Sequence, residues 1–353
     1  MLETKIITLN PQDIAIEPLK QAGEILRRGG LVIIPTDTVY GIAANSLNRK
    51  AVERLYQVKQ RPAEKNFSLL IEKKEKIEDF ARDIPVAAYK LVDKFWPGAL
   101  TIILKSTKAD TAGLRMPNQE IALKIIEFSG VPLACPSANI SGKPAPQNFS
   151  EAVAPFKGLV EMAIDAGTTI LGVESSVVDL SGGQMNILRE GAIKKEEIMQ
   201  ATSKKIVLFV CTGNSCRSVM AKALLEKKLK ERNREDVEVL SAGVMGLKGI
   251  GATQATREVL AKEGVDVSGH RSQGISSILV KKSDLILVME KIHEDKILQL
   301  APEVKNRVFL LKEFAKINQG SLDVEDPIGM SLEFYQLTVD IIKEAIERIA
   351  KII

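Results

Sequence analysis

The sequence is poor in cysteine, histidine and aromatic residues, and it contains no long apolar run. Three cysteines in 353 residues are too few for a disulfide framework, and the two histidines have no histidine or cysteine at metal-ligand spacing, so we expect no metal site. No apolar stretch approaches the roughly 20 residues of a membrane span. The N-terminal residues lack the regions of a signal peptide. These absences predict a cytoplasmic protein without a membrane partner, in which thiols stay reduced.

The chain does contain a nearly even balance of charge and a regular alternation of patterns. Its 49 basic and 45 acidic residues argue against a basic nucleic-acid-binding module. Strand-like apolar runs, such as 31–36 and 206–210, alternate with helical patterns, and this alternation predicts the α/β class. A chain of this length accommodates two domains of ordinary size. We place the break near 200–205, which gives domains 1–203 and 204–353.

The segment CTGNSCRS, residues 211–218, follows an apolar run and precedes a helical pattern. A strand that enters a tight loop, followed by a helix, directs backbone N–H groups at an anion. In such a loop Arg217 can hold two phosphate oxygens, and the positive field favours the Cys211 thiolate. A thiolate beside a bound phosphoryl group is a nucleophile, so the segment predicts transfer through a phosphocysteine. The alternative is a chance Cys–Arg spacing, which the strand–loop–helix context opposes.

A phosphoryl-transfer site also needs an acid, because the leaving group departs more easily when it is protonated. Asp326, followed by Pro327, is the best candidate, since it lies in a loop before the final helix, where a doubly wound sheet gathers its carboxyl-end loops. An Asp-Pro pair on its own also marks ordinary turns. We expect His270 to be structural and His293 to lie on the surface of a helix.

These residues belong to a set of motifs by which the second half resembles the low-molecular-weight protein tyrosine phosphatases. The motifs are VCTGNSCRS, SAG at 241–243, VDVSGHRS at 265–272, DLILVM at 284–289 and EDPIG at 325–329. The resemblance implies a flavodoxin-like parallel sheet that acts on phosphorylated proteins. It also implies that Cys211 is the nucleophile, Arg217 the phosphate clamp and Asp326 the general acid.

Further residues of the loop have supporting roles in that family. By position, Asn214 holds the shape of the loop and Ser218 hydrogen-bonds to the thiolate. The resemblance implies that Cys216 traps an oxidised Cys211 as a disulfide. A small buried packing residue is the alternative reading of Cys216.

Two positions depart from the tyrosine-specific pattern of the family. Ser215 stands where a bulky aliphatic residue is usual, and Ile328 and Gly329 stand where aromatic residues usually flank a phenyl ring. Protein-arginine phosphatases of this family carry threonine at the position of Ser215, and a hydroxyl suits a guanidinium. We therefore expect a phosphoarginine substrate, with phosphotyrosine as the alternative. The related arsenate reductases need two further cysteines, which this half lacks.

The first half has no Walker loop, so any nucleotide is held differently. Cationic and hydroxyl residues instead recur at the ends of apolar runs, and their convergence would suit a triphosphate and a carboxylate. This set comprises Thr38, Lys59, Arg61, Lys65, Arg115, Ser137, Asn139, Ser141, Ser175 and Arg189. Each of these residues taken singly could be an ordinary surface residue.

The motifs that contain this set resemble the YrdC family of threonylcarbamoyl-AMP synthases over about residues 10–195. They are PTDTVYGI, KQRPAEKNFSLLI, LRMP, CPSANISGKPAP, ESSVVD and ILREG. The resemblance implies a twisted mixed sheet with helices. It implies synthesis of threonylcarbamoyl-AMP from L-threonine, bicarbonate and ATP for tRNA modification, with Mg²⁺ accompanying the nucleotide and no tightly bound cofactor. A tRNA-threonylcarbamoyl transferase machinery would use the product.

By position the family assigns Thr38, Arg115 and Ser175 to threonine, with the Cys135 backbone near both ligands and Lys59 beside bicarbonate and the α-phosphate. The residues implied for the ATP site are Arg61, Lys65, Thr111, Ser137, Ala145 and Arg189.

Some positions depart from the family pattern: Cys135, Ser176, Glu190 and Leu70 stand where alanine, threonine, proline and histidine occur in other members. Two alternatives stay open for the first half. It could be a double-stranded-RNA-binding module with a degenerate site, which its charge balance opposes, or a silent scaffold for the other half.

Overall fold

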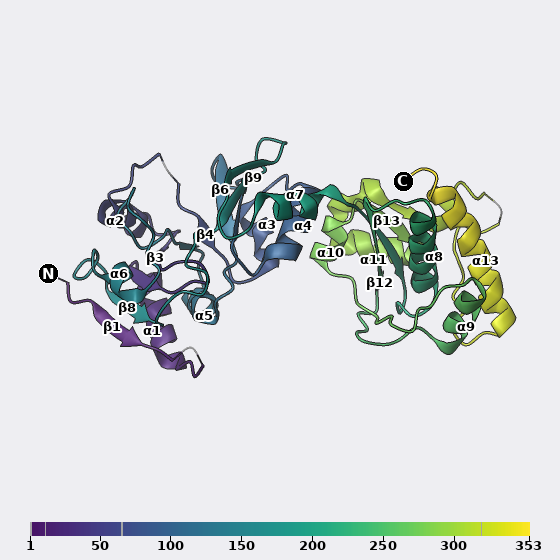
Figure 1. The fold of residues 1–353 in the computed structure, drawn as a ribbon, viewed down its shortest axis with the longest axis horizontal. Helices are drawn as coiled ribbons and strands as arrows, with labels where there is room; N and C mark the ends of the chain where they lie inside the picture. Colours follow the sequence, from purple (N-terminus) through teal and green to yellow (C-terminus); the bar gives the residue numbers. More distant parts are fainter. Residues whose placement is uncertain (1, 11, 65, 319) are drawn as a thin grey trace. The chain divides into compact units, whose positions relative to one another are not determined.

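The computed structural model describes residues 2–10, 12–64, 66–318 and 320–353, and these divide into two compact units, Met1–Ala201 and Thr202–Ile353 (Figure 1). The division falls inside helix α7 (Lys195–Ser203). No described helix combines the length and the apolar character needed to cross a bilayer.

The described part of the first unit contains one mixed sheet of ten strands in the order β1-β8-β2-β3-β7-β4-β6-β5-β9-β10. The sheet contains parallel pairs, such as β1 with β8 and β5 with β9, and antiparallel pairs, such as β2 with β3 and β5 with β6. The strands are β1 (Lys5–Thr8), β2 (Val32–Ile34), β3 (Gly41–Asn45), β4 (Leu69–Leu70), β5 (Leu100–Lys105), β6 (Thr111–Arg115), β7 (Leu133–Ala134), β8 (Met162–Asp165), β9 (Ser176–Asp179) and β10 (Asn186–Arg189).

Helices cover this sheet because its central strands are apolar on both faces. Along β2, Val32 and Ile34 pack into one core cluster with residues of α1 and α5, while Ile33 packs into another cluster with Leu55 of α2. Asn48 caps the N-terminus of α2 by accepting a hydrogen bond from Ala51 N at 3.2 Å. The helices before α7 are α1 (Ile16–Arg27), α2 (Arg49–Lys59), η1 (Lys74–Lys76), α3 (Ile77–Phe80), α4 (Val86–Phe95), α5 (Glu120–Ser129) and α6 (Phe149–Val153).

The second unit contains, within its described residues, a parallel sheet of four strands in the order β12-β11-β13-β14. These are β11 (Lys205–Cys211), β12 (Val237–Gly243), β13 (Leu285–Val288) and β14 (Val308–Leu310). The helices are α8 (Arg217–Glu231), α9 (Gln254–Lys262), α10 (Ser277–Lys282), α11 (Lys291–Leu300), η2 (Pro302–Arg307), α12 (Leu311–Phe314) and α13 (Leu332–Ile349).

The central strand of this sheet, β11, is buried from Ile206 to Cys211. Val207 and Phe209 pack on one face with residues of α8, α9 and α13, and Leu208 and Val210 pack on the other with residues of α10 and α11. The α/β class, the mixed first sheet and the parallel second sheet are therefore confirmed.

The order of the strands also explains where the second unit places its polar loop. The chain leaves β11 towards β12 on one side and later returns to β13 on the other side of β11. The carboxyl end of β11 is thus a topological switch point, where doubly wound sheets bind ligands.

Candidate active sites

Asn214 holds the loop that follows β11 in shape. It is fully buried and has a φ of 55°, a conformation that asparagine tolerates better than most residues. Its amide nitrogen donates to the hydroxyls of Ser218 at 3.0 Å and Ser241 at 2.9 Å, and its side-chain oxygen accepts from Gln273 N at 3.0 Å. The loop is therefore fastened to three separate segments. Gly243 completes the fit, because a Cβ there would lie 2.8 Å from Thr212 O.

Cys211 lies at the end of β11 and Ser218 in the first turn of α8, so the fold brings their side chains together. Cys211 Sγ is 3.0 Å from Ser218 Oγ, and both residues are buried. Ser218 Oγ already accepts the hydrogen bond from Asn214, so its own proton is available to the sulfur. Ser218 is therefore placed to donate a hydrogen bond to the sulfur of Cys211.

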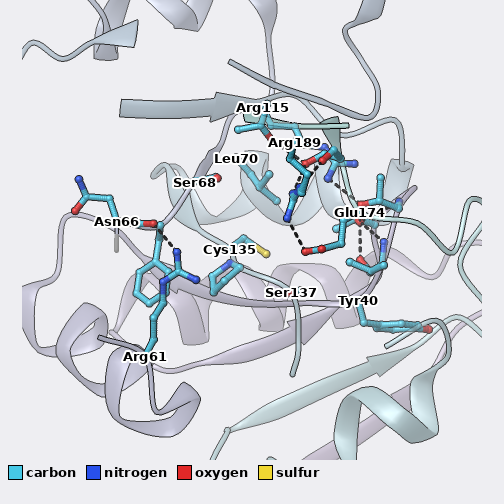
Figure 2. A pocket seen from close by; sticks show the side chains of 18 residues that line it. Tyr40, Arg61, Asn66, Ser68, Leu70, Arg115, Cys135, Ser137, Glu174 and Arg189 are labelled. Atoms are coloured by element: carbon cyan, nitrogen blue, oxygen red, sulfur yellow. Dashed lines mark hydrogen bonds and ion pairs between the residues drawn. The ribbon is translucent and has the colours of Figure 1, made fainter. Parts of the chain in front are cut away.

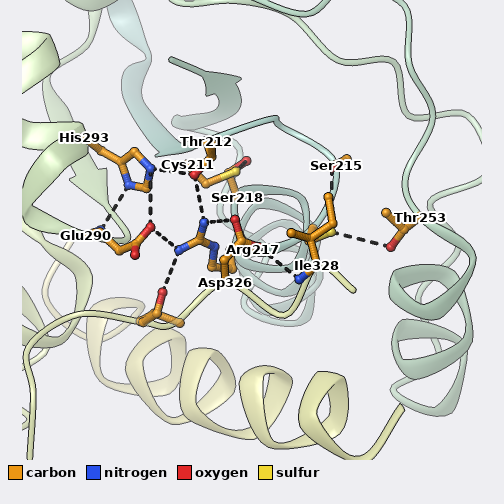
Figure 3. Close-up of polar contacts among 12 residues, drawn as sticks. Cys211, Thr212, Ser215, Arg217, Ser218, Thr253, Glu290, His293, Asp326 and Ile328 are labelled. Carbon is orange, nitrogen blue, oxygen red and sulfur yellow. Dashed lines mark hydrogen bonds and ion pairs between the residues drawn. The ribbon is translucent and has the colours of Figure 1, made fainter. Parts of the chain in front are cut away.

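Arg217 is at the centre of the site, and its side chain is only 1% exposed (Figure 3). Nη1 donates to Glu290 Oε2 at 2.5 Å and to Val324 O at 2.8 Å, while Nη2 donates to Thr212 Oγ1 at 3.0 Å and pairs with Asp326 Oδ2. Nε is buried and has no partner among the described residues.

An unsatisfied buried donor costs about 1–3 kcal/mol. An anion held in the loop is an acceptor that would satisfy Arg217 Nε, so this donor is consistent with an anion-binding loop.

Glu290 and His293 also belong to the site, although the sequence analysis did not assign them to it. His293 is fully buried, so its expected place on a helix surface is wrong. Its Nδ1 accepts from Glu290 N at 3.1 Å at the start of α11, so Nε2 carries the proton and donates to Thr212 Oγ1 at 3.0 Å. Burial lowers the pKa of His293, and Arg217 lowers it further. The signal in the sequence was E-x-x-H directly after a buried strand.

The remaining predicted residues lie around this centre. Cys216 is buried, with Sγ 3.5 Å from Thr253 Oγ1 and 3.6 Å from Tyr335 Oη. Ser215 is half-buried, and its Oγ is 3.7 Å from Cys216 Sγ. Ile328 is 61% exposed, and its backbone N–H donates to Asp326 Oδ1 at 3.2 Å.

In the first unit, a cavity brings together predicted residues from six separate stretches of the chain (Figure 2). Arg61 lies at one end beside Asn66, Arg115 and Arg189 lie at the other, and Cys135 lies between them. The predicted residues that line the cavity are Thr38, Arg61, Arg115, Cys135, Ser137, Ser175 and Arg189.

Arg115 is held at the end of β6 by a buried carboxylate. Its Nη2 donates to Asp37 Oδ1 at 2.5 Å, its Nη1 to Thr38 Oγ1 at 2.8 Å and its Nε to Gly98 O at 3.0 Å. Burial lowers the pKa of the guanidinium, and Asp37 opposes that effect. These three bonds use three of the five N–H donors of the arginine, which leaves one on each terminal nitrogen for a ligand.

Arg189 lies at the end of β10 and reaches the same cavity. It donates to Glu174 Oε1 at 2.8 Å, to Ser175 O at 2.9 Å and to Ser175 Oγ at 3.3 Å. Ser175 Oγ is also 2.9 Å from Thr101 Oγ1. The sequence analysis missed Asp37 and Glu174, although both lie next to predicted residues, because carboxylates were not sought in a site for anions.

Cys135 and Lys59 have unusual surroundings. Burial raises the pKa of Cys135 to about 12, against the opposing effects of Arg115 and Lys59, so the thiol stays protonated. Lys59 does not line the cavity. Its amine donates to the backbone carbonyl of Ser137, which lines the cavity, and to that of Asn139 at 2.7 Å. Burial, with a smaller effect of Arg61, lowers the pKa of Lys59 to about 8.

Two described residues that were predicted for the ATP site, Thr111 and Ala145, do not line the cavity. Thr111 lines a neighbouring hollow, which shares Asn66 and Phe67 with the cavity. Ala145 is half-buried, next to Pro146, whose carbonyl accepts from the Tyr40 backbone at 3.3 Å. Lys65 lies outside the described residues.

In the described part of the chain, no three His, Cys, Asp or Glu side chains are grouped to hold a metal ion.

The second unit thus has a doubly wound parallel sheet with a Cys–Arg anion loop, which is the architecture of the low-molecular-weight phosphatase class. The first unit has the mixed sheet and arginine-lined cavity of a Sua5-like fold.

Two family models match these halves. One, for the Sua5, YciO and YrdC proteins, carries the description "Telomere recombination" and matches residues 24–191. The other, "Low molecular weight phosphotyrosine protein phosphatase", matches residues 206–353. The chain belongs to both families, one in each half.

Individual relatives agree with this division. The chain is 43% identical over 189 residues to the threonylcarbamoyl-AMP synthase of Pyrococcus abyssi, which covers 51% of this chain and 56% of that protein. It is 36% identical over 208 residues to a putative threonylcarbamoyl-AMP synthase of Methanocaldococcus jannaschii, covering 56% of this chain and 98% of that protein. It is 38% identical over 145 residues to a protein-arginine-phosphatase of Geobacillus stearothermophilus, covering 41% and 93%.

A solved structure, P. abyssi Sua5 complexed with L-threonine, is similar with a TM-score of 0.55 and 25% identity, covering 97% of this chain and 98% of that one. The chain nevertheless spans only about half the length of the P. abyssi synthase that it matches in sequence, at 56%.

Proposed function

We propose that the chain is a bifunctional enzyme. Residues 1–203 make threonylcarbamoyl-AMP from L-threonine, bicarbonate and ATP for tRNA modification. Residues 204–353 form a cysteine-dependent protein phosphatase that prefers phosphoarginine. The synthases of P. abyssi and M. jannaschii support the first activity, and the arginine phosphatase of G. stearothermophilus supports the second. The enzyme would act in the cytoplasm, where a tRNA-threonylcarbamoyl transferase machinery would use the product of the synthase.

The observation that carries the synthase proposal is the position of Arg115. Its two remaining N–H groups suit the two oxygens of a carboxylate, beside hydroxyls of Thr38 and Ser175 that can bond to a small polar amino acid. L-threonine is that amino acid in the complex of P. abyssi Sua5. The cavity residue Cys135 would contact both substrates through its backbone.

The triphosphate would bind at the remaining cations and polar groups, with Mg²⁺ on its phosphates. The family resemblance assigns Arg61, Lys65, Thr111, Ser137, Ala145 and Arg189 to ATP; of these, Arg61, Ser137 and Arg189 line the cavity, and Thr111 lines the neighbouring hollow. Threonine's amine would capture CO₂ from bicarbonate as a carbamate, whose oxygen attacks the α-phosphorus and displaces pyrophosphate. The family resemblance assigns Lys59 a place beside bicarbonate and the α-phosphate. Because its ammonium is bonded to the carbonyls of Ser137 and Asn139, Lys59 would contribute at least by holding Ser137 in the cavity wall.

The observation that carries the phosphatase proposal is the buried, unpaired Nε of Arg217 in the same loop as the Cys211–Ser218 pair. A phosphate oxygen would accept from Nε, and a second would take the Nη2–H that now pairs with Asp326. The incoming phosphate would thereby release Asp326 from its ion pair with the arginine.

Once released beside the bound phosphate, Asp326 would take up a proton from solvent. It would pass this proton to the leaving group as the Cys211 thiolate forms a bond to phosphorus and the bond between phosphorus and the leaving group breaks. Water would then hydrolyse the phosphocysteine, with Asp326 accepting its proton. Asn214 keeps the loop in shape for both steps, and Cys216 would protect an oxidised Cys211 as a disulfide. Ser215 would bond to the guanidinium of the substrate, and Ile328 beside Asp326 offers no aromatic ring to a phenyl group.

Paired variants of the full chain test both activities at once. Arg115→Ala should lose pyrophosphate formation that depends on threonine and bicarbonate, because a charge-assisted pair contributes about 1.5–3 kcal/mol of binding. Cys211→Ser should abolish phosphatase activity, because a hydroxyl is not ionised at neutral pH. Each variant is the control for the other. ATP turnover without threonine would refute the synthase, and phosphatase activity of Cys211→Ser would refute the thiol mechanism.

A further inference from the structure

Two segments border the anion loop on the side of Ser215. Thr253 N donates to Ser215 O at 3.2 Å, and His270 Nε2 lies 2.8 Å from Asn214 O. The stretches that contain Thr253 and His270 therefore lie directly against the loop. A hollow between them is lined by Gly249, Gly251, Ala252, Arg257, Ser268 and Arg271.

This hollow is basic. Arg257 and Arg271 line it, and Lys248 directly precedes the lining residue Gly249. All three are exposed, and none of them forms an ion pair with a carboxylate of the described structure. By contrast, other arginines of this unit, such as Arg234 and Arg348, pair with acids at 2.6 Å. Three cations beside a catalytic loop are thus available to a ligand.

The carboxylates near these three cations form hydrogen bonds with other groups. Asp266 accepts from the backbone and hydroxyl of Ser268 at 2.8 and 2.9 Å, and Glu258 on α9 accepts from Gln254 at 2.8 Å. Arg271 itself donates through Nη1 to the carbonyls of His270 at 2.7 Å and Ser268 at 3.1 Å, which leaves the donors on Nε and Nη2 for a ligand. The neighbouring carboxylates therefore do not neutralise Lys248, Arg257 and Arg271.

We propose that Lys248, Arg257 and Arg271 form a docking surface for an acidic segment of the phosphorylated protein substrate. The inference rests on the proposed phosphatase activity and adds the class of sequence that the enzyme selects. A phosphorylated side chain in the loop would place its flanking residues over the hollow beside Ser215. Guanidinium groups bind carboxylates with two parallel hydrogen bonds, and a basic rim increases the rate of encounter with an acidic chain.

The experiment uses the full chain and two matched peptides that carry the same phosphorylated residue, one flanked by aspartates and the other by asparagines. We expect kcat/KM to be about 3- to 20-fold higher for the acidic peptide, since each exposed ion pair contributes about 0.2–1 kcal/mol. The preference should vanish at about 0.5 M salt, where screening is strong. Arg257→Gln combined with Arg271→Gln should remove the preference and leave hydrolysis of a small aryl phosphate unchanged.

The control replaces two exposed lysines elsewhere on the unit, Lys296→Gln with Lys305→Gln. It removes the same amount of positive charge as the double arginine variant. This control should keep the preference. Binding of the two peptides to Cys211→Ser, followed by fluorescence anisotropy, gives a second readout that needs no turnover.

The results separate the surface from the catalytic function. Absence of any phosphatase activity would refute the proposed function, whereas normal aryl phosphate hydrolysis with equal kcat/KM and equal binding for the two peptides would refute only the surface. Tighter binding of a single-stranded oligonucleotide than of the acidic peptide would also overturn the proposal, because the surface would then serve a nucleic acid.

Discussion

Each unit buries one arginine at the centre of its candidate site, but the two arginines are held differently. Arg115 pairs with Asp37, whose side chain is only 5% exposed. Arg217 pairs with Glu290 and Asp326, whose side chains are 27% and 31% exposed. A carboxylate that reaches solvent can leave its arginine at modest cost, whereas a buried one cannot. We therefore expect Arg115 to act as a fixed clamp and Arg217 to exchange a protein carboxylate for a phosphate.

The largest expected effect tests that exchange. Asp326→Asn should lower kcat of the phosphatase by about 10²–10⁴-fold, the usual contribution of a general acid, and leave the synthase unchanged. The loss should be smallest for aryl phosphates whose leaving group needs no proton, and it is measured by comparing kcat across such a series. An equal loss for every leaving group would mean that Asp326 acts only by holding Arg217.

The second prediction compares the partners of the two arginines. Asp37→Asn leaves the buried Arg115 without a charge partner and should destabilise the first unit by about 3–5 kcal/mol. Glu290→Gln should cost the second unit about 1 kcal/mol or less, because Arg217 keeps Asp326. Urea unfolding measures both. The single tryptophan of the chain, Trp96, reports on the first unit, and circular dichroism reports on both. Equal losses would contradict the distinction between a fixed and an exchangeable clamp.

The two sites also differ in how far the sequence predicted them. Cys211, Arg217 and Ser218 lie within eight consecutive residues, 211–218, so the loop could be interpreted from local chemistry. The apolar run 206–210 predicted the strand before it. The Arg115 site joins stretches that are far apart in the chain, so residue chemistry alone yielded a list of cations, and the family resemblance supplied the arrangement.

What the sequence did not reveal has a common physical cause. Asp37, Glu174 and Glu290 are carboxylates that orient arginines, and single-sequence patterns do not show which acid faces which base across a sheet. His293 was expected on the surface because it is a polar residue in a largely polar helix. In the structure it shares the buried side of α11 with Ile297, and it hydrogen-bonds to Thr212 in a loop about 80 residues earlier.

The third prediction concerns what the phosphatase selects. Ser215→Ile replaces a polar contact beside the loop with an apolar wall. Such a change should move the ratio of kcat/KM for phosphoarginine and phosphotyrosine peptides towards phosphotyrosine by about 10–200-fold. Small aryl phosphates test only the loop and the acid, so they provide the control. A parent enzyme that prefers phosphotyrosine, or a variant with an unchanged ratio, would show that Ser215 does not contact the substrate.

The smallest expected effect concerns pH, and it again separates the two units. Both histidines of the chain, His270 and His293, lie in the second unit. Burial lowers the pKa of each, with Arg217 adding to the effect on His293. As pH falls below about 6.5, the usual pKa of an unfolded histidine, the unfolded second unit takes up protons that the folded unit resists. Its free energy of unfolding should therefore decrease as pH falls from about 7 to 5.5.

Calorimetric scans of the full chain at several pH values in this range measure the effect, with Trp96 fluorescence identifying the transition of the first unit. That transition should stay nearly constant, because the first unit has no histidine. His293→Gln keeps a donor near Thr212 and removes one titrating group, so it should flatten the pH dependence of the second transition while costing little at pH 7. A variant that retains the full slope would place the titration elsewhere, and a slope in the first transition instead would contradict the assignment of acid sensitivity to the second unit.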